Sequence, residues 1–183
     1  MIAECLIFLY TLVPVEQNLT FNFIDQYRQC NQIISDEIKE HADILIEYFG
    51  EDHKQLSTAV KVIWCESRGV ETAVRTAEGN YDTGLFQFVS WTWNWVAEKY
   101  DLPMWNEWVV MKNDRPYTDQ VVSKTSYGFT FQKAQYTEYF NIKFGYLLSQ
   151  DIYGRSQWKD WSSSEWCWGN TQSWIKKVKQ ERN

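Results

Sequence analysis

Apolar residues recur at helical spacing between residues 21 and 66, and this periodicity constrains the fold more than any other feature of the sequence. Over residues 21–49 the spacing is mostly three, four and seven positions, which predicts one or two amphipathic helices that end at Gly50. A further helix is predicted to begin near Ser57, a good N-cap, and to end at Gly69. Glu66 falls on the apolar stripe of this helix.

The rest of the chain is predicted to form shorter elements. These are a loop or small irregular hairpin at 70–88, a helix at 91–100 capped by Ser90, a turn at 113–116, a helix at 134–149 and a short C-terminal helix. Residues 104–133 have only weak periodicity. This pattern predicts an α+β class in which helices predominate.

The first twenty residues contain a short, nearly continuous apolar run at residues 6–13. A membrane span needs about 20 apolar residues, so the run does not predict one. The run resembles the apolar core of a secretory signal, but it lacks a basic leader and a clear cleavage site. Residues 1–20 are therefore either the remnant of a secretory signal or an ordinary buried segment. Residues 21–183 are predicted to form a single domain, of which 21–50 is an N-terminal helical part.

Aromatic residues are unusually frequent, with 11 Trp, 11 Tyr and 10 Phe. They serve either a large aromatic core or a surface on which flat ligands such as sugars and bases stack. The net charge of −6 disfavours nucleic acid as a partner, since nucleic-acid binding depends on a cationic patch. Only the tail "WIKKVKQERN" is basic, and a solvated helix end accounts for it. Carbohydrate is therefore the favoured ligand.

The four cysteines and two histidines are widely spaced. They show neither the spacing of a metal site nor a Cys–His pair for nucleophilic catalysis. The sequence therefore predicts no metal and no cofactor.

Glu66 is predicted to lie at the C-terminal end of a buried helix, where an ionised carboxylate is unfavourable. Desolvation and the negative end of the helix dipole both raise the pKa of a carboxyl group. A carboxylic acid that stays protonated beside a cleft is what the cleavage of a glycosidic bond requires, because the leaving oxygen must receive a proton. The alternative is structural: the carboxylate reaches solvent, or it pairs with Arg68 or Arg75.

Three short motifs follow one another along the chain. They are Glu66-Ser67 at a predicted helix end, "GLFQF" at 84–88, and Asn-Ile with Gly-Tyr-Leu within 141–147. Over residues 56–169 the chain resembles the lysozyme-like superfamily, in the branch of soluble lytic transglycosylases and goose-type lysozymes. Each motif alone is short, but their order and spacing are more specific.

The resemblance implies a lysozyme-like fold in which a small hairpin or loop region lines a sugar-binding cleft. It also implies cleavage of the β-1,4 bond between N-acetylmuramic acid and N-acetylglucosamine in peptidoglycan, with Glu66 as general acid/base. By the same resemblance the residues that bind or support the substrate are Ser67, Gly84, Gln87, Phe88, Asn141 and Tyr146. We expect a secreted or cell-envelope protein that acts as a monomer on glycan strands.

The chain departs from the family pattern where a second carboxylate is expected. Goose-type lysozymes have an aspartate just after the Gly-Leu-x-Gln stretch, and this chain has Phe88-Val89 there. Glu78 and Asp82 are the candidate second carboxylates, although a solvated loop carboxylate is the simpler interpretation of each. Inverting hydrolysis needs a second carboxylate and transglycosylation does not, so a lytic transglycosylase is favoured. A hydrolytic muramidase and a non-catalytic sugar-binding protein on the same fold are the alternatives.

The resemblance also implies a disulfide between Cys65 and Cys167. A lysozyme-like fold would bring these two residues together, and in an extracellular setting they should oxidise. The alternative is a pair of buried, reduced thiols in a cytosolic protein. Cys5 and Cys30 form a second candidate pair if the N-terminus is retained.

Overall fold

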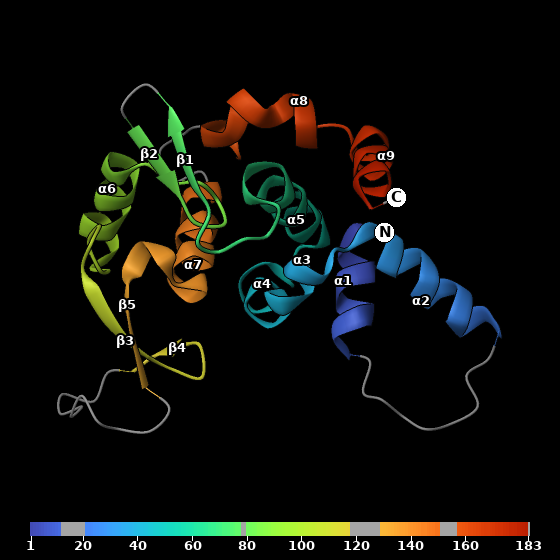
Figure 1. Ribbon diagram of the computed structural model, residues 1–183, viewed down its shortest axis with the longest axis horizontal. Helices are drawn as coiled ribbons and strands as arrows, with labels where there is room; N and C mark the ends of the chain where they lie inside the picture. The colour runs from blue at the N-terminus through green and yellow to red at the C-terminus, as the bar shows by residue number, and fades with distance from the viewer. Residues whose placement is uncertain (12–20, 78–79, 118–128, 151–156, 183) are drawn as a thin grey trace. The chain divides into compact units, whose positions relative to one another are not determined.

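The structure is a computed structural model that describes residues 1–11, 21–77, 80–117, 129–150 and 157–182. The chain divides into two compact units (Figure 1). Unit 1 comprises Met1–Gly69 and Trp158–Asn183, and unit 2 comprises Val70–Gln157. The sequence predicted one domain and did not indicate this division, in which the first unit is made of two separate stretches of chain.

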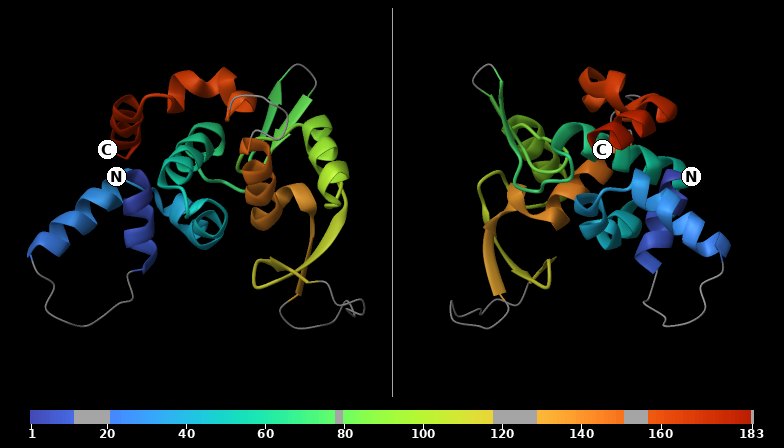
Figure 2. Two further views of the ribbon diagram at one scale, coloured as in Figure 1. Left: turned by 180° about the vertical axis from the view of Figure 1, so that it is seen from behind. Right: turned by 45° about the vertical axis from the view of Figure 1, so that its right-hand side comes forward.

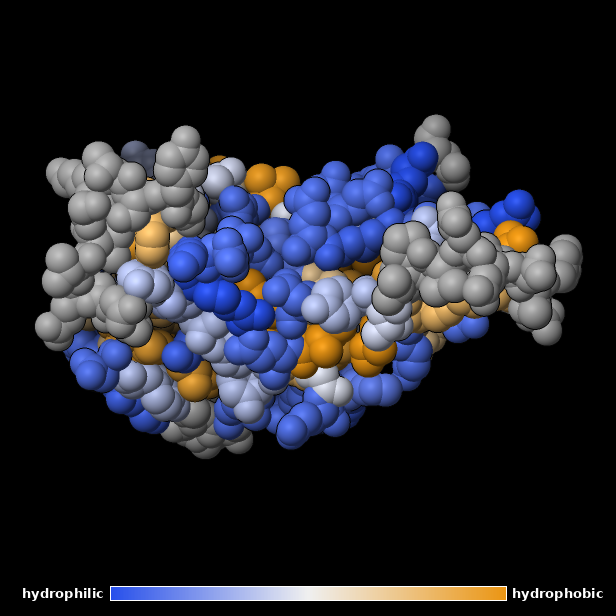
Figure 3. All heavy atoms as spheres, turned by 90° about the horizontal axis from the view of Figure 1, so that it is seen from below, coloured by the Kyte–Doolittle hydropathy of each residue, from blue (hydrophilic) through white to orange (hydrophobic). Residues whose placement is uncertain are grey.

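Helices predominate among the described residues, and the described strands form small antiparallel sheets. The predicted α+β class with a helical majority is therefore confirmed. Within the described ranges, no helix is long and apolar enough to cross a membrane. On the face shown in Figure 3, hydrophilic residues predominate, and the hydrophobic residues that are visible form small separate patches.

Unit 1 is built from helices around α5 (Figure 1). The elements are α1 (Ile2–Thr11), α2 (Phe21–Ile33), α3 (Asp36–Glu40), α4 (Ala42–Phe49), α5 (His53–Ser67), η2 (Lys159–Ser164), α8 (Glu165–Trp168) and α9 (Thr171–Glu181). Helix α5 contacts α1, α3, α4, α8 and η2. Residues 59–64 of α5 are all buried, whichever side of the helix they occupy. Burial on every side makes α5 the central helix of the unit.

The first residues of α5 differ from the prediction. Its N-cap is Asp52, whose carboxylate accepts hydrogen bonds from the backbone N–H groups of Lys54 and Gln55. The predicted cap, Ser57, lies inside the helix, and its Oγ accepts a hydrogen bond from the backbone N–H of Ala3 in α1 at 3.1 Å. Ser57 is therefore used for packing between helices, and the prediction of its capping role was wrong.

Residues 21–49 form three helices, where the sequence predicted one or two. The extra helix start is at Ser35, whose side chain accepts a hydrogen bond from the backbone N–H of Ile38. Helix α4 ends at Phe49, so the predicted stop at Gly50 is confirmed. The apolar periodicity of residues 21–49 is nearly continuous, but the N-cap at Ser35 starts a new helix within it.

The N-terminal segment is part of unit 1. Residues 2–11 form α1, in which Ile2, Ala3 and Leu6 are buried and contribute to the core. Cys5 forms a disulfide with Cys30 of α2. The first part of this segment therefore belongs to the core of unit 1, and residues 12–20 lie outside the described ranges.

Unit 2 has small sheets and two longer helices. Its elements are β1 (Val74–Ala77), β2 (Asn80–Thr83), α6 (Ser90–Tyr100), β3 (Trp108–Lys112), β4 (Arg115–Pro116), β5 (Phe129–Lys133), η1 (Ala134–Tyr136) and α7 (Glu138–Ser149). Strands β1 and β2 form an antiparallel hairpin, and the second sheet has the order β4-β3-β5. Figures 1 and 2 show the hairpin at one end of unit 2 and the β4-β3-β5 sheet at the other, with α6 and α7 between them.

The core of unit 2 is aromatic. The rings of Trp93 in α6 and Phe144 in α7 stack with centroids 3.8 Å apart and an interplanar angle of 14°. Phe88 packs edge-on against Trp93 at 5.7 Å, and Trp105 does so from another direction at 6.0 Å. Part of the high aromatic content therefore serves packing, one of the two roles that the composition allowed.

The β4-β3-β5 sheet falls where the sequence was least informative. The predicted turn is present as a tight connection between β3 and β4, with Asn113 and Asp114 at φ of 48° and 59°. Positive φ at both central residues matches the twist of a two-residue hairpin and suits Asn and Asp. The strands themselves were not predicted.

All four cysteines form disulfides, and Cys65–Cys167 joins α5 to α8 as predicted. The two bridges span 102 and 25 residues. In the chain-entropy model, loops of these lengths stabilise the fold by up to about 4.7 and about 3.5 kcal/mol. Both bridges are consistent with a protein that folds in an oxidising compartment.

We predict that the double variant Cys65→Ala/Cys167→Ala loses more stability than Cys5→Ala/Cys30→Ala, because its bridge closes the longer loop. Urea unfolding with and without reductant measures both losses. Under reducing conditions the wild type should approach the stability of a quadruple variant in which all four cysteines are replaced by alanine. A peptide map in which Cys65 and Cys167 are not linked would contradict the assignment.

Candidate functional site

Glu66 lies on the last turn of α5 and is half-buried. Its neighbours on the helix, Ile63 and Ser67, are buried, and Cys65 beside it is fixed to α8 by the disulfide. Helix and disulfide together hold the backbone at this position. A rigid backbone is the first requirement for a group that must transfer a proton in a defined direction.

Arg68 ends the helix. It adopts a left-handed conformation with φ of 60°, and its backbone N–H donates to the carbonyl oxygen of Trp64 at 3.2 Å. Its side chain donates to the carbonyl oxygens of Trp64 and Cys65, and its guanidinium carbon lies 4.0 Å from the centre of the Trp64 ring. It also forms a bidentate ion pair with Glu181 of α9, with both N–O distances at 3.0 Å. These contacts satisfy carbonyl groups at the C-terminus of α5 and tie that end to α9.

Ser67 is buried and completes the helix end. Its hydroxyl donates to the carbonyl oxygen of Ile63 at 3.1 Å and accepts from the backbone N–H of Gly69 at 3.2 Å. The carbonyl oxygen of Gly69 is in turn 2.8 Å from Nε2 of the buried His41. Ser67 therefore supports the conformation of the chain that follows Glu66.

In unit 2 the "GLFQF" motif forms a tight loop. Thr83 and Phe88 exchange backbone hydrogen bonds of 3.0 and 2.9 Å, which closes the loop between them. Gly84 has a φ of 79° and Gln87 a φ of 52°. The Gln87 side-chain amide donates to the carbonyl oxygens of Gly84 and Ala73, at 2.8 and 3.1 Å. In this conformation the NH₂ group of Gln87 holds the loop together.

Asn141 of α7 joins this loop to the helix. Its Oδ1 accepts from the backbone N–H of Phe86 at 2.9 Å, and its Nδ2 donates to the carbonyl oxygen of Gln135 at 3.2 Å. A Cβ on Gly84 would lie only 1.9 Å from that Nδ2, and a Cβ on Gly145 would lie 2.5 Å from the Phe86 ring. The two motifs of unit 2 are therefore packed directly against each other.

The predicted sugar-contacting residues of unit 2 have different surroundings. Asn141 is 1% exposed and Phe88 is 3% exposed, within the aromatic core, so both serve the fold in this structure. A buried ring cannot stack on a sugar, which is why Phe88 does not fit its predicted place in the groove. Tyr146 is half-buried on α7. Gly84, Gln87 and Asn141 lie together in unit 2, and Glu66 and Ser67 lie in unit 1.

One of the two candidate second carboxylates is described. Asp82 of β2 pairs across the hairpin with Arg75 of β1, and its Oδ2 is 2.7 Å from Nη2 and 3.0 Å from Nε. The residue is only 8% exposed. Glu78 lies outside the described residues.

Several aromatic side chains are exposed, and no sequence pattern distinguished them from the buried ones. Among the described residues, the most exposed tryptophans and tyrosines, at 53–77%, are Trp166, Trp91, Trp108, Tyr81 and Tyr10. Exposed indole rings are suited to stacking on the faces of sugars. Aromatic side chains of the core and those on the surface differ in their burial, and burial is known only from the folded structure.

Among the residues that the structure describes, no cluster of three or more His, Cys, Asp or Glu side chains could hold a metal ion. Comparisons with protein-family models, with curated proteins and with solved structures each found no match to this chain.

We predict that Gly84 and Asn141 are energetically coupled. Gly84→Ala places a Cβ against the Asn141 amide and also holds Ala at positive φ, which alone costs about 1–2 kcal/mol. Asn141→Ala leaves the Phe86 N–H without its acceptor, at a cost of about 1–3 kcal/mol. In the double variant the clash with the Asn141 amide is removed, and only the 2.9 Å contact of the new Cβ with the Gln135 carbonyl oxygen is left. The two losses should therefore fall short of additivity by roughly 0.5–3 kcal/mol.

Denaturant unfolding of the four proteins measures this coupling. Gly84→Ala in a Tyr146→Phe background is the matched control. Tyr146 lies on the same helix as Asn141, and none of its atoms is among the three nearest to a Cβ placed on Gly84. Additive losses in the Gly84–Asn141 cycle would contradict the packing described above.

Proposed function

We propose that this protein cleaves the β-1,4 glycosidic bond between N-acetylmuramic acid and N-acetylglucosamine in peptidoglycan, with Glu66 as general acid/base. The observation that carries the proposal is the position of Glu66, half-buried on the last turn of α5. A carboxyl group at the negative end of a helix dipole is favoured in its protonated form. The motif order supports the same assignment by resemblance to lytic transglycosylases and goose-type lysozymes.

In the proposed reaction Glu66 donates its proton to the bridging oxygen while positive charge develops at the anomeric carbon of the muramoyl residue. The glycosidic C–O bond breaks, and the released sugar leaves with a new hydroxyl group. The carboxylate of Glu66 then accepts the proton of the muramoyl 6-hydroxyl, whose oxygen bonds to the anomeric carbon. The products are a 1,6-anhydromuramoyl end and a protonated Glu66, so a single acid/base group completes the cycle.

A lytic transglycosylase is favoured over a hydrolase because of Asp82. A general base for water needs an accessible carboxylate, and the Asp82 carboxylate is held in the ion pair with Arg75 and is nearly buried. The anhydro-forming route requires no such second group. A hydrolytic muramidase remains the second candidate, with Asp82 or Glu78 as the base.

The exposed tryptophans and the two disulfides agree with the rest of the proposal. Exposed indole rings offer sites on which a glycan strand can stack, and disulfides are typical of proteins exported to an oxidising compartment. We therefore propose a secreted or cell-envelope protein. Its partner is the peptidoglycan strand, with no requirement for a metal or cofactor.

Glu66→Gln keeps the size of the side chain and removes the transferable proton. We predict that it lowers the rate of peptidoglycan clearance by about 10²–10⁴-fold, the usual contribution of a positioned acid. Its thermal unfolding should match the wild type. Glu165→Gln, an exposed glutamate of α8 in the same unit, is the matched control and should clear peptidoglycan at the wild-type rate. A Glu66→Gln variant that keeps more than roughly a tenth of the wild-type rate would exclude Glu66 as the acid.

Mass spectrometry of the digested glycan identifies the reaction. We predict that 1,6-anhydromuramoyl ends dominate. Muramic acid ends that borohydride can reduce would instead show hydrolysis, and Asp82→Asn would then be the next variant to test. An intact glycan that still retains the protein in a pull-down would select the non-catalytic sugar-binding alternative.

A further inference from the structure

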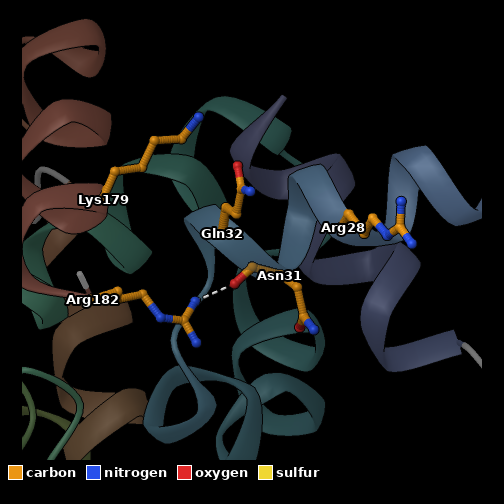
Figure 4. A pocket seen from close by; sticks show the side chains of 5 residues that line it. All are labelled: Arg28, Asn31, Gln32, Lys179 and Arg182. Carbon is orange, nitrogen blue, oxygen red and sulfur yellow. Dashed lines mark hydrogen bonds between the residues drawn. The ribbon is translucent and has the colours of Figure 1, made fainter.

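A cationic pocket lies in unit 1 between the C-terminal ends of α2 and α9, which contact each other (Figure 4). It has a volume of about 470 Å³ and is lined by Arg28, Asn31, Gln32, Lys179 and Arg182. Three of these five side chains carry a positive charge, and the other two are amides. The whole chain has a net charge of −6, so this is a local concentration of charge opposite in sign to that of the protein.

Arg182 is the fixed member of the pocket. Its guanidinium donates to the carbonyl oxygen of Asn31, the contact drawn in Figure 4, and to that of Ile34 at 3.1 Å. Its Nη2 lies 3.9 Å from a carboxylate oxygen of Asp36. The side chain is 33% exposed, so its position is set while one side remains open to a ligand. Because this group is already ordered, a ligand loses less affinity to side-chain ordering when it binds there.

Arg28 and Lys179 are exposed charges of the pocket. The Arg28 side chain is 71% exposed, and its contact with Asp25 is long, at 4.0 Å. Lys179 is exposed on the last turn of α9. Figure 4 shows Lys179 and Arg182 extending from α9 on the side that faces α2. Arginine forks and a lysine ammonium recognise oxyanions, and the amide groups of Asn31 and Gln32 can add neutral hydrogen bonds.

We propose that this pocket, the α2–α9 pocket, binds the phosphate group of a phosphorylated ligand. Phosphate suits the set better than a carboxylate because its several oxygens can meet donors from both helices at once. The volume falls in the range of small-molecule sites and exceeds that of a bare phosphate, which leaves space for an organic group attached to it. The proposal does not depend on Glu66 or on the cleavage of peptidoglycan.

Helix ends alone also attract cations, because the C-terminus of a helix carries partial negative charge. A role limited to that attraction predicts that loss of Lys179 lowers stability and leaves ligand binding unchanged. A phosphate site predicts instead that loss of Lys179 weakens ligand binding and leaves stability unchanged. Measuring both properties therefore separates the two roles.

The test is calorimetric titration of the full chain with pyrophosphate at constant ionic strength, with sodium chloride as the reference. We expect Lys179→Gln and Arg28→Gln each to weaken binding about tenfold or more, the usual effect of losing one charge-assisted hydrogen bond. Lys176→Gln, which removes the same charge from an exposed side chain of α9 that does not line the pocket, is the matched control and should change the affinity less than about twofold. Circular dichroism confirms that each variant is folded.

The source of the phosphate is distinguished by three further probes: inorganic phosphate, glycerol 3-phosphate, and vesicles of phosphatidylglycerol compared with phosphatidylcholine. Binding of glycerol 3-phosphate that depends on Lys179 identifies a soluble ligand, and Lys179-dependent binding to phosphatidylglycerol vesicles alone identifies a lipid headgroup. The proposal is overturned if none of the phosphate probes binds at millimolar concentration, or if Lys176→Gln weakens binding as much as Lys179→Gln. Peptidoglycan cleavage should be unchanged in Lys179→Gln, so failure here leaves the proposed function untouched.

Discussion

The burial of α5 on every side is the constraint on which unit 1 depends. Its central residues are buried even where the sequence places a charge. Lys61 is only 7% exposed, its ammonium donates to the Thr171 hydroxyl at 3.3 Å, and burial lowers its pKa. The Asp52 cap, the disulfide at Cys65 and the side chain of Arg68 then fix both ends of the helix. Glu66 therefore takes its position from a rigid element, which gives a candidate acid a defined direction.

Unit 2 depends on a different interaction, the contact of the 84–88 loop with α7. Asn141 provides a side-chain acceptor for the loop, and Gly84 and Gly145 provide the space for the close approach. The joint presence of these motifs thus has a structural cause, since each part needs the other to pack. The order of these motifs in the sequence is therefore explained by the packing of the 84–88 loop on α7. The chemistry of the proposed function depends on Glu66 alone.

The elements that could be predicted from the sequence are those set by local signals. Periodicity located α7, Gly69 marked the end of α5, and the turn residues of 70–88 indicated the β1–β2 hairpin. The strands of the β4-β3-β5 sheet were missed because β3 and β5 pair across a long stretch of chain, and Trp108–Lys112 carries apolar residues on both faces. The site shows the same limit: spacing placed Glu66 on a buried stripe, but only packing shows that Phe88 belongs to the core.

The net charge of the chain and the charge of a local cluster act over different distances. This difference gives the proposed α2–α9 pocket and the proposed cleavage of peptidoglycan different dependences on salt. Beyond about 8 Å at physiological ionic strength an approaching anion is largely screened, and at closer range it meets only the nearest side chains. A net charge of −6 is therefore compatible with the proposed binding of an anion at a pocket that Arg28, Lys179 and Arg182 line. Such binding should weaken as salt increases, because these side chains are exposed. The proposed proton transfer from Glu66 would depend instead on one half-buried group and a fixed helix end. Salt should accordingly affect the α2–α9 pocket more strongly than the transfer of the proton.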